Sequence, residues 1–302
     1  MSVLLRLASL LALLVVGAGL RTGGVLDDRR ADWLNDAAYY VALPALIFVS
    51  TYSRSVSEIL SPVLVVGVFV VFFGTAVVAF VVHRRHDASA RRSVATVQSY
   101  HSNLGYLGVP LVAATFDDHV TAIASAILGM VSLVQIPLTV FVLSTINGAD
   151  TTLRNELRRI LTTPVLIALV AGLGVGSLGI PVPGAVAGGL DLVGQFALPL
   201  ALLCVGSSLE IDLPAVDYGA VAGVVGLKIL VMPTLAWAVF STLHADTATF
   251  TAGVVMFATP TAVSTFVFAN ELGGDEAFAS LNVFLTTLVS MGSLFVFLTV
   301  LG

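Results

Sequence analysis

Long apolar stretches alternate with short polar interruptions along the whole chain. A helix that crosses a bilayer needs about 20 mainly apolar residues, and the interruptions leave ten stretches of about that length. This pattern predicts an all-α polytopic membrane protein with ten transmembrane spans, at residues 3–20, 34–52, 59–82, 93–116, 120–146, 160–178, 186–209, 218–242, 248–272 and 277–301. The connecting loops are too short for a soluble domain, so the function must lie inside the bilayer or at its faces.

The two halves of the chain match each other at a constant offset of 155 residues. LVVGAG at 14–19 matches LVAGLG at 169–174, and Asp36 with Pro44 matches Asp191 with Pro199. Each half holds five predicted spans, an odd number, so the second half must cross the membrane in the opposite sense. This predicts two inverted five-helix repeats, at residues 1–147 and 156–302. In transporters with such repeats, the substrate site lies near the midplane and is built from interrupted helices.

Helix-breaking residues interrupt two of the predicted spans. The fourth contains SNLGYLGVPLV at 102–112, and the corresponding ninth contains FATPTAVST at 257–265. A proline removes one backbone donor and frees carbonyl groups, which in hydrocarbon must face protein or a water-filled cavity. The alternative is a pair of kinks whose carbonyls are satisfied by neighbouring helices. Because the two breaks lie in corresponding spans, we predict that they form a site.

The chemistry of the broken helices favours an anionic ligand. A helix that restarts after a break offers unpaired N–H groups and a partial positive charge, which suit a carboxylate. Side chains beside the breaks add donors and acceptors. The candidate substrate-binding residues are Asn103, Gly105, Gly108, Pro110, Thr259, Pro260, Thr261 and Ser264.

Three charged or titratable residues lie in or beside these spans. Lys228 is the single lysine and falls deep within the eighth span, where a charge is costly. In a structural role, it would anchor the span to freed carbonyl groups. In a functional role, it would attract a substrate carboxylate or take the place of a bound cation. His101 either exchanges a proton or packs through a hydrogen bond. Glu271 either coordinates a cation or lies at the interface.

Composition and charge agree with a membrane protein and suggest its orientation. The chain is 58% hydrophobic and 10% charged, with a mean hydropathy of +1.04, far from ordinary soluble domains. Cytoplasmic loops accumulate Lys and Arg. If both termini are outside, ten of the twelve arginines fall in cytoplasmic loops and only Arg6 and Arg54 fall outside. This predicts a multi-pass cell-membrane protein with both termini outside.

Several other functions lack the residues that they require. Cys204 is the single cysteine, so disulfide scaffolds and cysteine metal clusters are excluded. The histidines show no metal-binding spacing, and His83 is expected to be solvated at a loop edge. An intramembrane enzyme would need paired catalytic groups, which are not evident, and a ligand sensor would need a signalling domain. We therefore expect no enzyme, no metal site and no cofactor, although coupling to protons or sodium stays open.

The two breaks carry a resemblance to a known family. GVPL at 108–111, placed five residues after Asn103, resembles the fourth-span motif of the auxin efflux carrier family. FVFANE at 266–271 resembles the segment after the ninth-span break of its plant members, and Gly273, Gly274 and Asp275 resemble its prokaryotic members. The resemblance covers the full chain in the number and order of spans.

The resemblance implies a fold like that of sodium/proton antiporters and bile acid symporters. Spans 1, 2, 6 and 7 would form a scaffold domain, and spans 3 to 5 and 8 to 10 a mobile transport domain. The substrates would be carboxylates such as indole-3-acetate, malate or malonate, carried by alternating access.

We expect a small organic anion as the substrate, membrane lipid as the surroundings and no nucleic-acid partner. Gly172 and Gly176 have the spacing of close helix packing, either within the chain or in a homodimer through the scaffold domain.

Overall fold

The computed structural model describes residues 3–150, 153–208 and 218–301, and in these residues helices are the only regular elements. Residue 209, the predicted end of the seventh span, and the outermost residues of the predicted repeats, 1 and 302, lie outside the described residues. One isolated antiparallel bridge, between Ser102 and Thr261, is the extended pairing found within the described residues.

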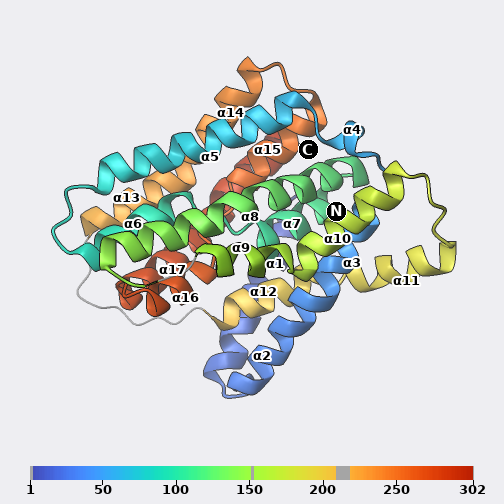
Figure 1. Ribbon diagram of the computed structural model, residues 1–302. Helices are drawn as coiled ribbons and strands as arrows, with labels where there is room; N and C mark the ends of the chain where they lie inside the picture. Colours follow the sequence, from blue (N-terminus) through green and yellow to red (C-terminus); the bar gives the residue numbers. More distant parts are fainter. Residues whose placement is uncertain (1–2, 151–152, 209–217, 302) are drawn as a thin grey trace.

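The first half runs from α1 to α8 (Figure 1). Its elements are α1 Val3–Thr22, α2 Asp28–Asp36, the π-helix η1 Ala37–Ala42, α3 Leu43–Thr51, α4 Val56–Ile59, α5 Pro62–His83, α6 Ser89–Tyr100, the π-helix η2 Leu104–Gly108, α7 Val109–Thr115 and α8 Asp118–Asn147.

The second half runs from α9 to the end of the described chain. Its elements are α9 Leu153–Leu161, α10 Pro164–Ser177, α11 Gly184–Gly194, α12 Ala197–Ser207, α13 Tyr218–Gly226, the π-helix η3 Leu227–Val231, α14 Met232–Thr242, α15 Thr247–Phe257, α16 Ser264–Glu271 and α17 Glu276–Leu301.

Helical stretches occur in all ten predicted spans, but not all are long enough to cross a bilayer. Six continuous stretches are long and apolar enough: 28–51, 62–83, 118–147, 184–207, 218–242 and 276–300. Four shorter apolar helical stretches, of 10 to 17 residues, are Ala12–Thr22 within α1, Leu104–Thr115, Pro164–Leu178 and Thr247–Phe257, in the first, fourth, sixth and ninth predicted spans. The prediction of a polytopic helical membrane protein therefore holds, while the ten-span inverted repeat stays a prediction.

Side-chain caps and prolines fix where several of these helices begin. Ser61 accepts a hydrogen bond from the backbone N–H of Leu64 and is followed by Pro62 at the start of α5. Asp117 caps α8 in the same way through two backbone N–H groups. Such caps satisfy N–H groups that have no partner within the helix. At the other end of α8, Gly148 takes the left-handed conformation with φ 72° and ends the helix.

Each of the three π-helical segments ends just before a proline. These prolines are Pro44 after η1, Pro110 after η2 and Pro233 after η3, each in the first turn of the following α-helix. Proline has no N–H and its ring crowds the preceding turn, so an ordinary helical turn does not fit there. A wider π turn shifts the hydrogen bonds by one residue and relieves this conflict.

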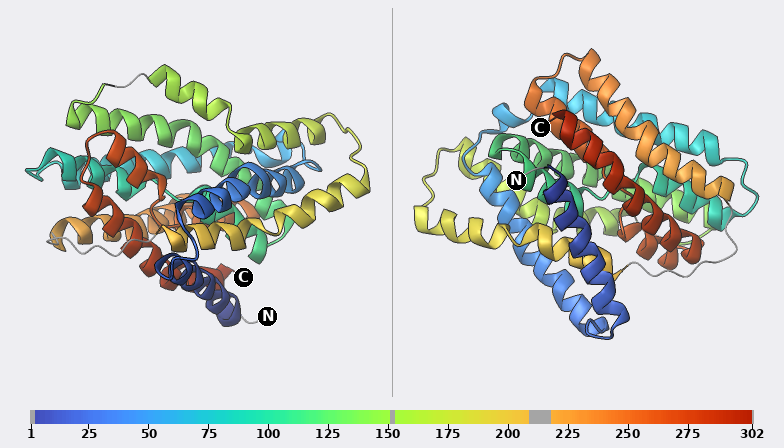
Figure 2. Two further views of the ribbon diagram at one scale, coloured as in Figure 1. Left: turned by 90° about the horizontal axis from the view of Figure 1, so that it is seen from below. Right: turned by 180° about the vertical axis from the view of Figure 1, so that it is seen from behind.

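The helices pack in two groups, which the views of Figure 2 show from two further directions. In the first group α1 lies against α12, and α3 lies against α10 and α11. In the second group α5 packs on α6 and α14, and α15 packs on α8 and α14. These groups contain the spans assigned above to the scaffold and transport domains, an assignment that stays a prediction because packing does not reveal motion.

Close glycine contacts hold the first group together. Gly172 lies against Thr51 of α3, and Gly176 lies against the backbone of Arg54. The choice left open by the sequence is therefore resolved for these two glycines, which pack α10 within the chain.

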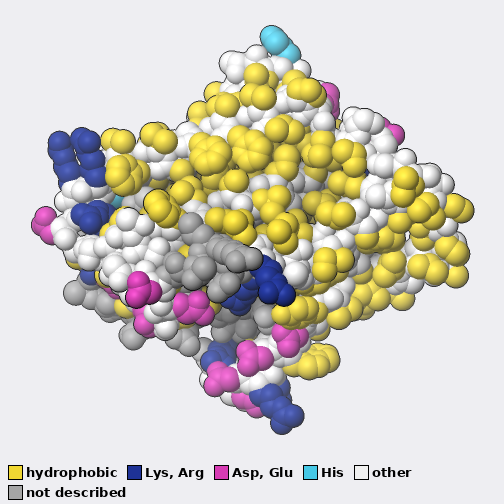
Figure 3. Space-filling model, in the orientation of Figure 1, with side chains coloured by type: hydrophobic (Ala, Val, Ile, Leu, Met, Phe, Trp, Pro, Cys, Tyr) yellow, Lys and Arg dark blue, Asp and Glu magenta, His cyan; other side chains and the backbone are white. Residues whose placement is uncertain are grey.

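Apolar side chains cover most of the face in Figure 3, while Lys and Arg side chains gather toward its left and lower margins.

His83 differs from our expectation, because its side chain is fully buried and its Nε2 lies 3.0 Å from Ser99 Oγ of α6. The packing of α6 against the end of α5 shields it from solvent.

Candidate functional site

The two interrupted helices belong to the second helix group and meet at their breaks. α6 ends at Tyr100 before η2, and α15 ends at Phe257 before α16. We call the non-helical residues between them, 101–103 and 258–263, the crossing. Within it, the N–H of Asn103 donates to the carbonyl of Pro260 at 2.8 Å, and the N–H of Ala262 donates to the carbonyl of His101 at 3.1 Å. The structure thus brings the two predicted breaks into direct contact.

The backbone groups of residues 101–103 all have hydrogen-bond partners. Ser102 lies between its neighbours in the crossing, and its N–H and carbonyl turn away from Thr261 toward the side-chain amide of Gln135 on α8. The carbonyl of Asn103 accepts a bond from the N–H of Gly108 at 3.0 Å. A buried backbone group without a partner is costly, so this pairing allows extended chain to lie inside a helical membrane protein.

Glycine and proline of the GVPL motif let the two broken helices approach each other. A Cβ atom on Gly108 would lie 2.8 Å from Met256 Sδ and 3.4 Å from Thr259 Cγ2. Pro110 is buried in the first turn of α7. Gly105 is half-buried, with a hypothetical Cβ at ordinary contact distance from Leu43. Gly108 is therefore the position where the absent side chain matters most.

Lys228 reaches the crossing from η3. Its side chain is fully buried, and Nζ donates to Ser102 Oγ at 2.6 Å and to the carbonyl of Phe257 at 3.3 Å. Met232 Sδ, a weak acceptor, lies 3.1 Å away. In the described residues no carboxylate lies within ion-pair distance of Nζ. The lysine is thus held by neutral groups, one of them a carbonyl at the break in the ninth predicted span.

Other side chains of the crossing make internal hydrogen bonds. His101 Nδ1 lies 2.8 Å from Thr139 Oγ1 of α8. Thr259 Oγ1 donates to the carbonyl of Met256 at 2.8 Å, and Thr261 Oγ1 donates to the carbonyl of Gln98 at 2.6 Å. These hydroxyl protons are therefore already engaged within the protein.

Asn103 differs from these side chains. It is 4% exposed, and within the described residues its side-chain amide makes no hydrogen bond. The amide could therefore bind a ligand without first breaking an internal bond. Asn103 is also the residue before η2, and it does not cap the N–H groups of that helix start with its side chain.

Two candidates are exposed and lie outside the crossing, Ser264 directly after it and Glu271 farther along α16. Ser264 is the first residue of that helix, and Glu271 is its last. Among the residues that the structure describes, no group of three or more His, Cys, Asp or Glu side chains could hold a metal ion.

Gly273 and Asp275, which follow α16, form the turn between α16 and α17. Gly273 makes the turn with φ 70°, and Asp275 then accepts a hydrogen bond from the N–H of Phe278 at the start of α17. The same carboxylate forms an ion pair with Arg91 of α6 at 3.1 Å. This motif therefore ties the turn before α17 to the helix that leads into the crossing.

Gln98, Ser102 and Gln135 are buried parts of the site that our sequence analysis missed. Gln98 donates through Nε2 to Thr265 Oγ1 and to the carbonyl of Ala279, both at 3.0 Å. The signal in the sequence was an uncharged amide within a predicted span, since such groups need partners in an apolar surrounding. This signal alone does not reveal the partner.

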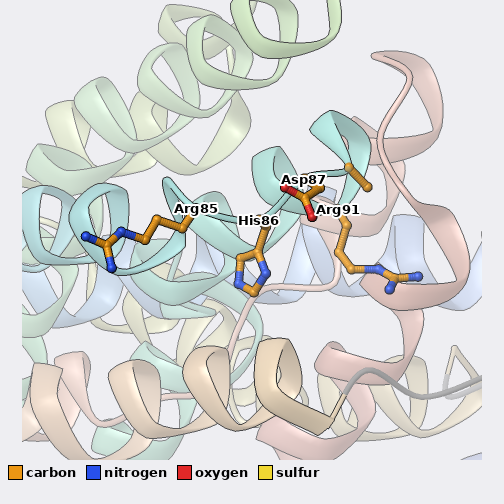
Figure 4. Close-up of a pocket in the computed structure, with 5 residues that line it drawn as sticks. Arg85, His86, Asp87 and Arg91 are labelled. Atoms are coloured by element: carbon orange, nitrogen blue, oxygen red, sulfur yellow. The ribbon is translucent and has the colours of Figure 1, made fainter.

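A surface cavity of about 260 Å³ lies elsewhere, in the loop between α5 and α6 (Figure 4). It is lined by Arg85, His86, Asp87, Ala88 and Arg91. In Figure 4 the Arg85 and Arg91 side chains extend in opposite directions, so they do not converge on one ligand. We therefore place the candidate site at the crossing.

Comparisons with known proteins agree with a transport role. A family model described as a membrane transport protein matches residues 2–298. An uncharacterized transporter of Methanothermobacter thermautotrophicus (strain Delta H) is 28% identical, over 95% of this chain and 94% of that protein. A provisionally named malonate transporter of Rhizobium meliloti (strain 1021) is 24% identical over the same shares. Because the family model covers nearly the whole chain, the protein belongs to this family of membrane transport proteins, in agreement with its resemblance to the auxin efflux carriers.

Proposed function

We propose that this protein is a secondary carrier of small organic anions, of the malonate and malate class, that works by alternating access. The observation that carries the proposal is the crossing, where a buried lysine and an asparagine with an unengaged amide lie beside the uncapped start of a helix. A helix start offers free N–H groups and partial positive charge, and the lysine adds a full charge when protonated. Both complement a carboxylate.

Dicarboxylates fit these features better than large aromatic acids. The crossing is closely packed, since Gly108 faces Met256 and Thr259 at contact distance. The name of the Rhizobium relative also points to a small dicarboxylate. Malonate is therefore the first substrate to test, followed by malate and indole-3-acetate.

The remaining parts of the proposal concern motion and coupling. The two inverted five-helix repeats would place α5, α6, α8, α14, α15 and α17 in a transport domain that moves against a scaffold of α1, α3, α10 and α12. Lys228 would occupy the place at which related symporters bind a cation. Transport would then be independent of sodium.

Transport into proteoliposomes tests this function. Purified protein should take up radiolabelled malonate into vesicles preloaded with unlabelled malonate, and omission of sodium should leave the rate unchanged. Thermal unfolding provides a second measurement, because a ligand of the folded state raises stability with its concentration relative to Kd. Failure of every tested carboxylate in both assays would contradict the proposed substrate class, and a strict need for sodium would contradict the role of Lys228 as a cation substitute.

A further inference from the structure

Gln135 of α8 binds the backbone of Ser102 as a neighbouring β-strand would. The N–H of Ser102 donates to Gln135 Oε1 at 2.9 Å, and Gln135 Nε2 donates to the carbonyl of Ser102 at 3.2 Å. The orientation of the amide is determined, because a backbone N–H only donates and a carbonyl only accepts. Gln135 is itself 4% exposed.

These two bonds complete the pairing of the crossing. In an antiparallel pair, successive residues turn their N–H and carbonyl groups alternately toward and away from the partner strand. The carbonyl of His101 accepts from the N–H of Ala262, and the N–H of Asn103 donates to the carbonyl of Pro260. The groups of Ser102 therefore face away from that strand, and in this apolar interior they need another partner, which is Gln135.

Ser102 also connects Gln135 to Lys228, the charged side chain of the site. Ser102 Oγ accepts a hydrogen bond from Lys228 Nζ at 2.6 Å, and Ser102 directly precedes Asn103. A displacement of the Ser102 backbone would thus move the partner of Lys228 and the attachment point of the Asn103 amide together. A misplacement of about 1 Å is enough to impair a binding site strongly.

We infer that Gln135 is a positioning residue for the carboxylate site: its amide holds the Ser102 backbone so that Lys228 and Asn103 keep their places at the crossing. The expected effect of Gln135 on substrate binding rests on the proposed function. The expected effect of Gln135 on the backbone of the crossing rests on the hydrogen bonds alone. The two effects therefore need separate measurements.

The substitution Gln135→Glu offers a test that depends on pH. An ionised carboxylate still accepts from the Ser102 N–H, but it has lost the donor and places a lone pair against the Ser102 carbonyl. A protonated carboxyl group has one donor and one acceptor, as the amide has. The methionine side chain in Gln135→Met is similar in length to glutamine and makes neither hydrogen bond to Ser102 at any pH. Gln195→Met is the matched control, because Gln195 is an exposed glutamine that bonds to Asp191.

The KM for malonate is measured for each variant relative to wild type at the same pH, between pH 5 and 8. We expect Gln135→Met to raise the KM about tenfold or more at every pH, because both hydrogen bonds to the buried Ser102 backbone are lost. Gln135→Glu should match that loss at pH 8 and return toward the wild-type KM at pH 5. Gln195→Met should leave the KM unchanged. A wild-type KM in Gln135→Met would overturn the inference.

Amide hydrogen exchange separates failure of this inference from failure of the proposed function. Even if wild type transports no carboxylate, Gln135→Met should speed exchange of the Ser102 and Asn103 amides, after correction for the intrinsic rate. Lowering the pH should restore protection in Gln135→Glu. If Gln135→Met does not fold, Gln135→Glu at the two pH values gives the comparison within one protein. Unchanged protection in both variants would refute the positioning role.

Discussion

Buried polar side chains at the crossing differ in whether their hydrogen-bonding groups are used within the protein. Thr259 and Thr261 use their hydroxyl protons within the protein, while Asn103 keeps its amide unengaged within the described residues. Lys228 is held by a hydroxyl, a carbonyl and a thioether. A side chain that forms hydrogen bonds to neighbouring buried groups contributes to stability. An amide without such a bond, or a charge without an opposite charge beside it, is available to bind a ligand.

Replacing Lys228 with Gln removes the charge and keeps a polar side chain. We expect a folded protein whose KM for malonate rises about tenfold or more, because hydrogen bonds to charged groups contribute about 1.5–3 kcal/mol. Uptake kinetics in proteoliposomes measure this change. Met232→Leu is the matched control, since it removes the thioether near Nζ without removing charge. Wild-type kinetics in Lys228→Gln would leave the lysine with a purely structural role.

Replacing Asn103 with Ala tests the unengaged amide. The change removes a donor and an acceptor without breaking a side-chain hydrogen bond described in the structure. The KM for malonate should rise by a factor corresponding to about 1–3 kcal/mol, while the temperature of unfolding stays close to that of wild type. Asn270→Ala is the control, because Asn270 is exposed on α16. An unchanged KM in Asn103→Ala would place the substrate away from this amide.

Close contacts at the scale of helices depend on glycine at particular positions. A Cβ atom on Gly206 of α12 would lie 2.2 Å from the carbonyl oxygen of Leu14 on α1, and one on Gly17 of α1 would lie 2.4 Å from the carbonyl oxygen of Leu203. α1 and α12 therefore pack backbone to backbone, each through a glycine. Small residues that permit such an approach are a main source of helix association in membranes.

Gly206→Ala should destabilise the protein through this contact. The obstructing atom belongs to the backbone, so α1 and α12 must separate, at a cost of about 1–3 kcal/mol for overpacking. Thermal unfolding in detergent should show a clear decrease in the midpoint. Gly188→Ala on α11 is the control, since a Cβ there meets no atom within 4 Å and alanine favours helix. If both variants unfold at the wild-type temperature, the α1–α12 contact is looser than described.

At the scale of the whole molecule, the basic residues and the apolar surface are separated. Exposed apolar side chains such as Val70, Val77 and Phe80 line α5, as expected for contact with lipid, whereas Arg84 and Arg85 directly follow that helix in an exposed loop. The arginine asymmetry of the loops predicts that this loop is cytoplasmic.

Single cysteines test the predicted orientation. Ala88 in the α5–α6 loop and Thr247 at the start of α15 are both exposed, and the native Cys204 is buried. In intact cells an impermeant thiol reagent should label Thr247→Cys and leave Ala88→Cys unlabelled. Permeabilised cells provide the control, because both positions should then react. Labelling of Ala88→Cys in intact cells would reverse the orientation.

The sequence by itself determined that the protein is helical, spans the membrane and has interrupted helices, because these properties follow from local composition. Apolar stretches must be buried or face lipid, and the residues around Pro110 and Pro260 disfavour regular helix within two of these stretches. The same reasoning found Asn103 and Lys228, since polar groups within such stretches are conspicuous.

Only the tertiary structure decided which of these groups meet. Gln135 and Ser102 are 33 residues apart, and Ser102 and Lys228 are 126 residues apart, so no local pattern links them. His83 is buried against Ser99 of α6 and Gly223 of α13, and Ser264 is exposed although it directly follows the crossing. Hydrogen bonds between distant segments depend on how the helices pack, and packing depends on surfaces from the whole chain at once.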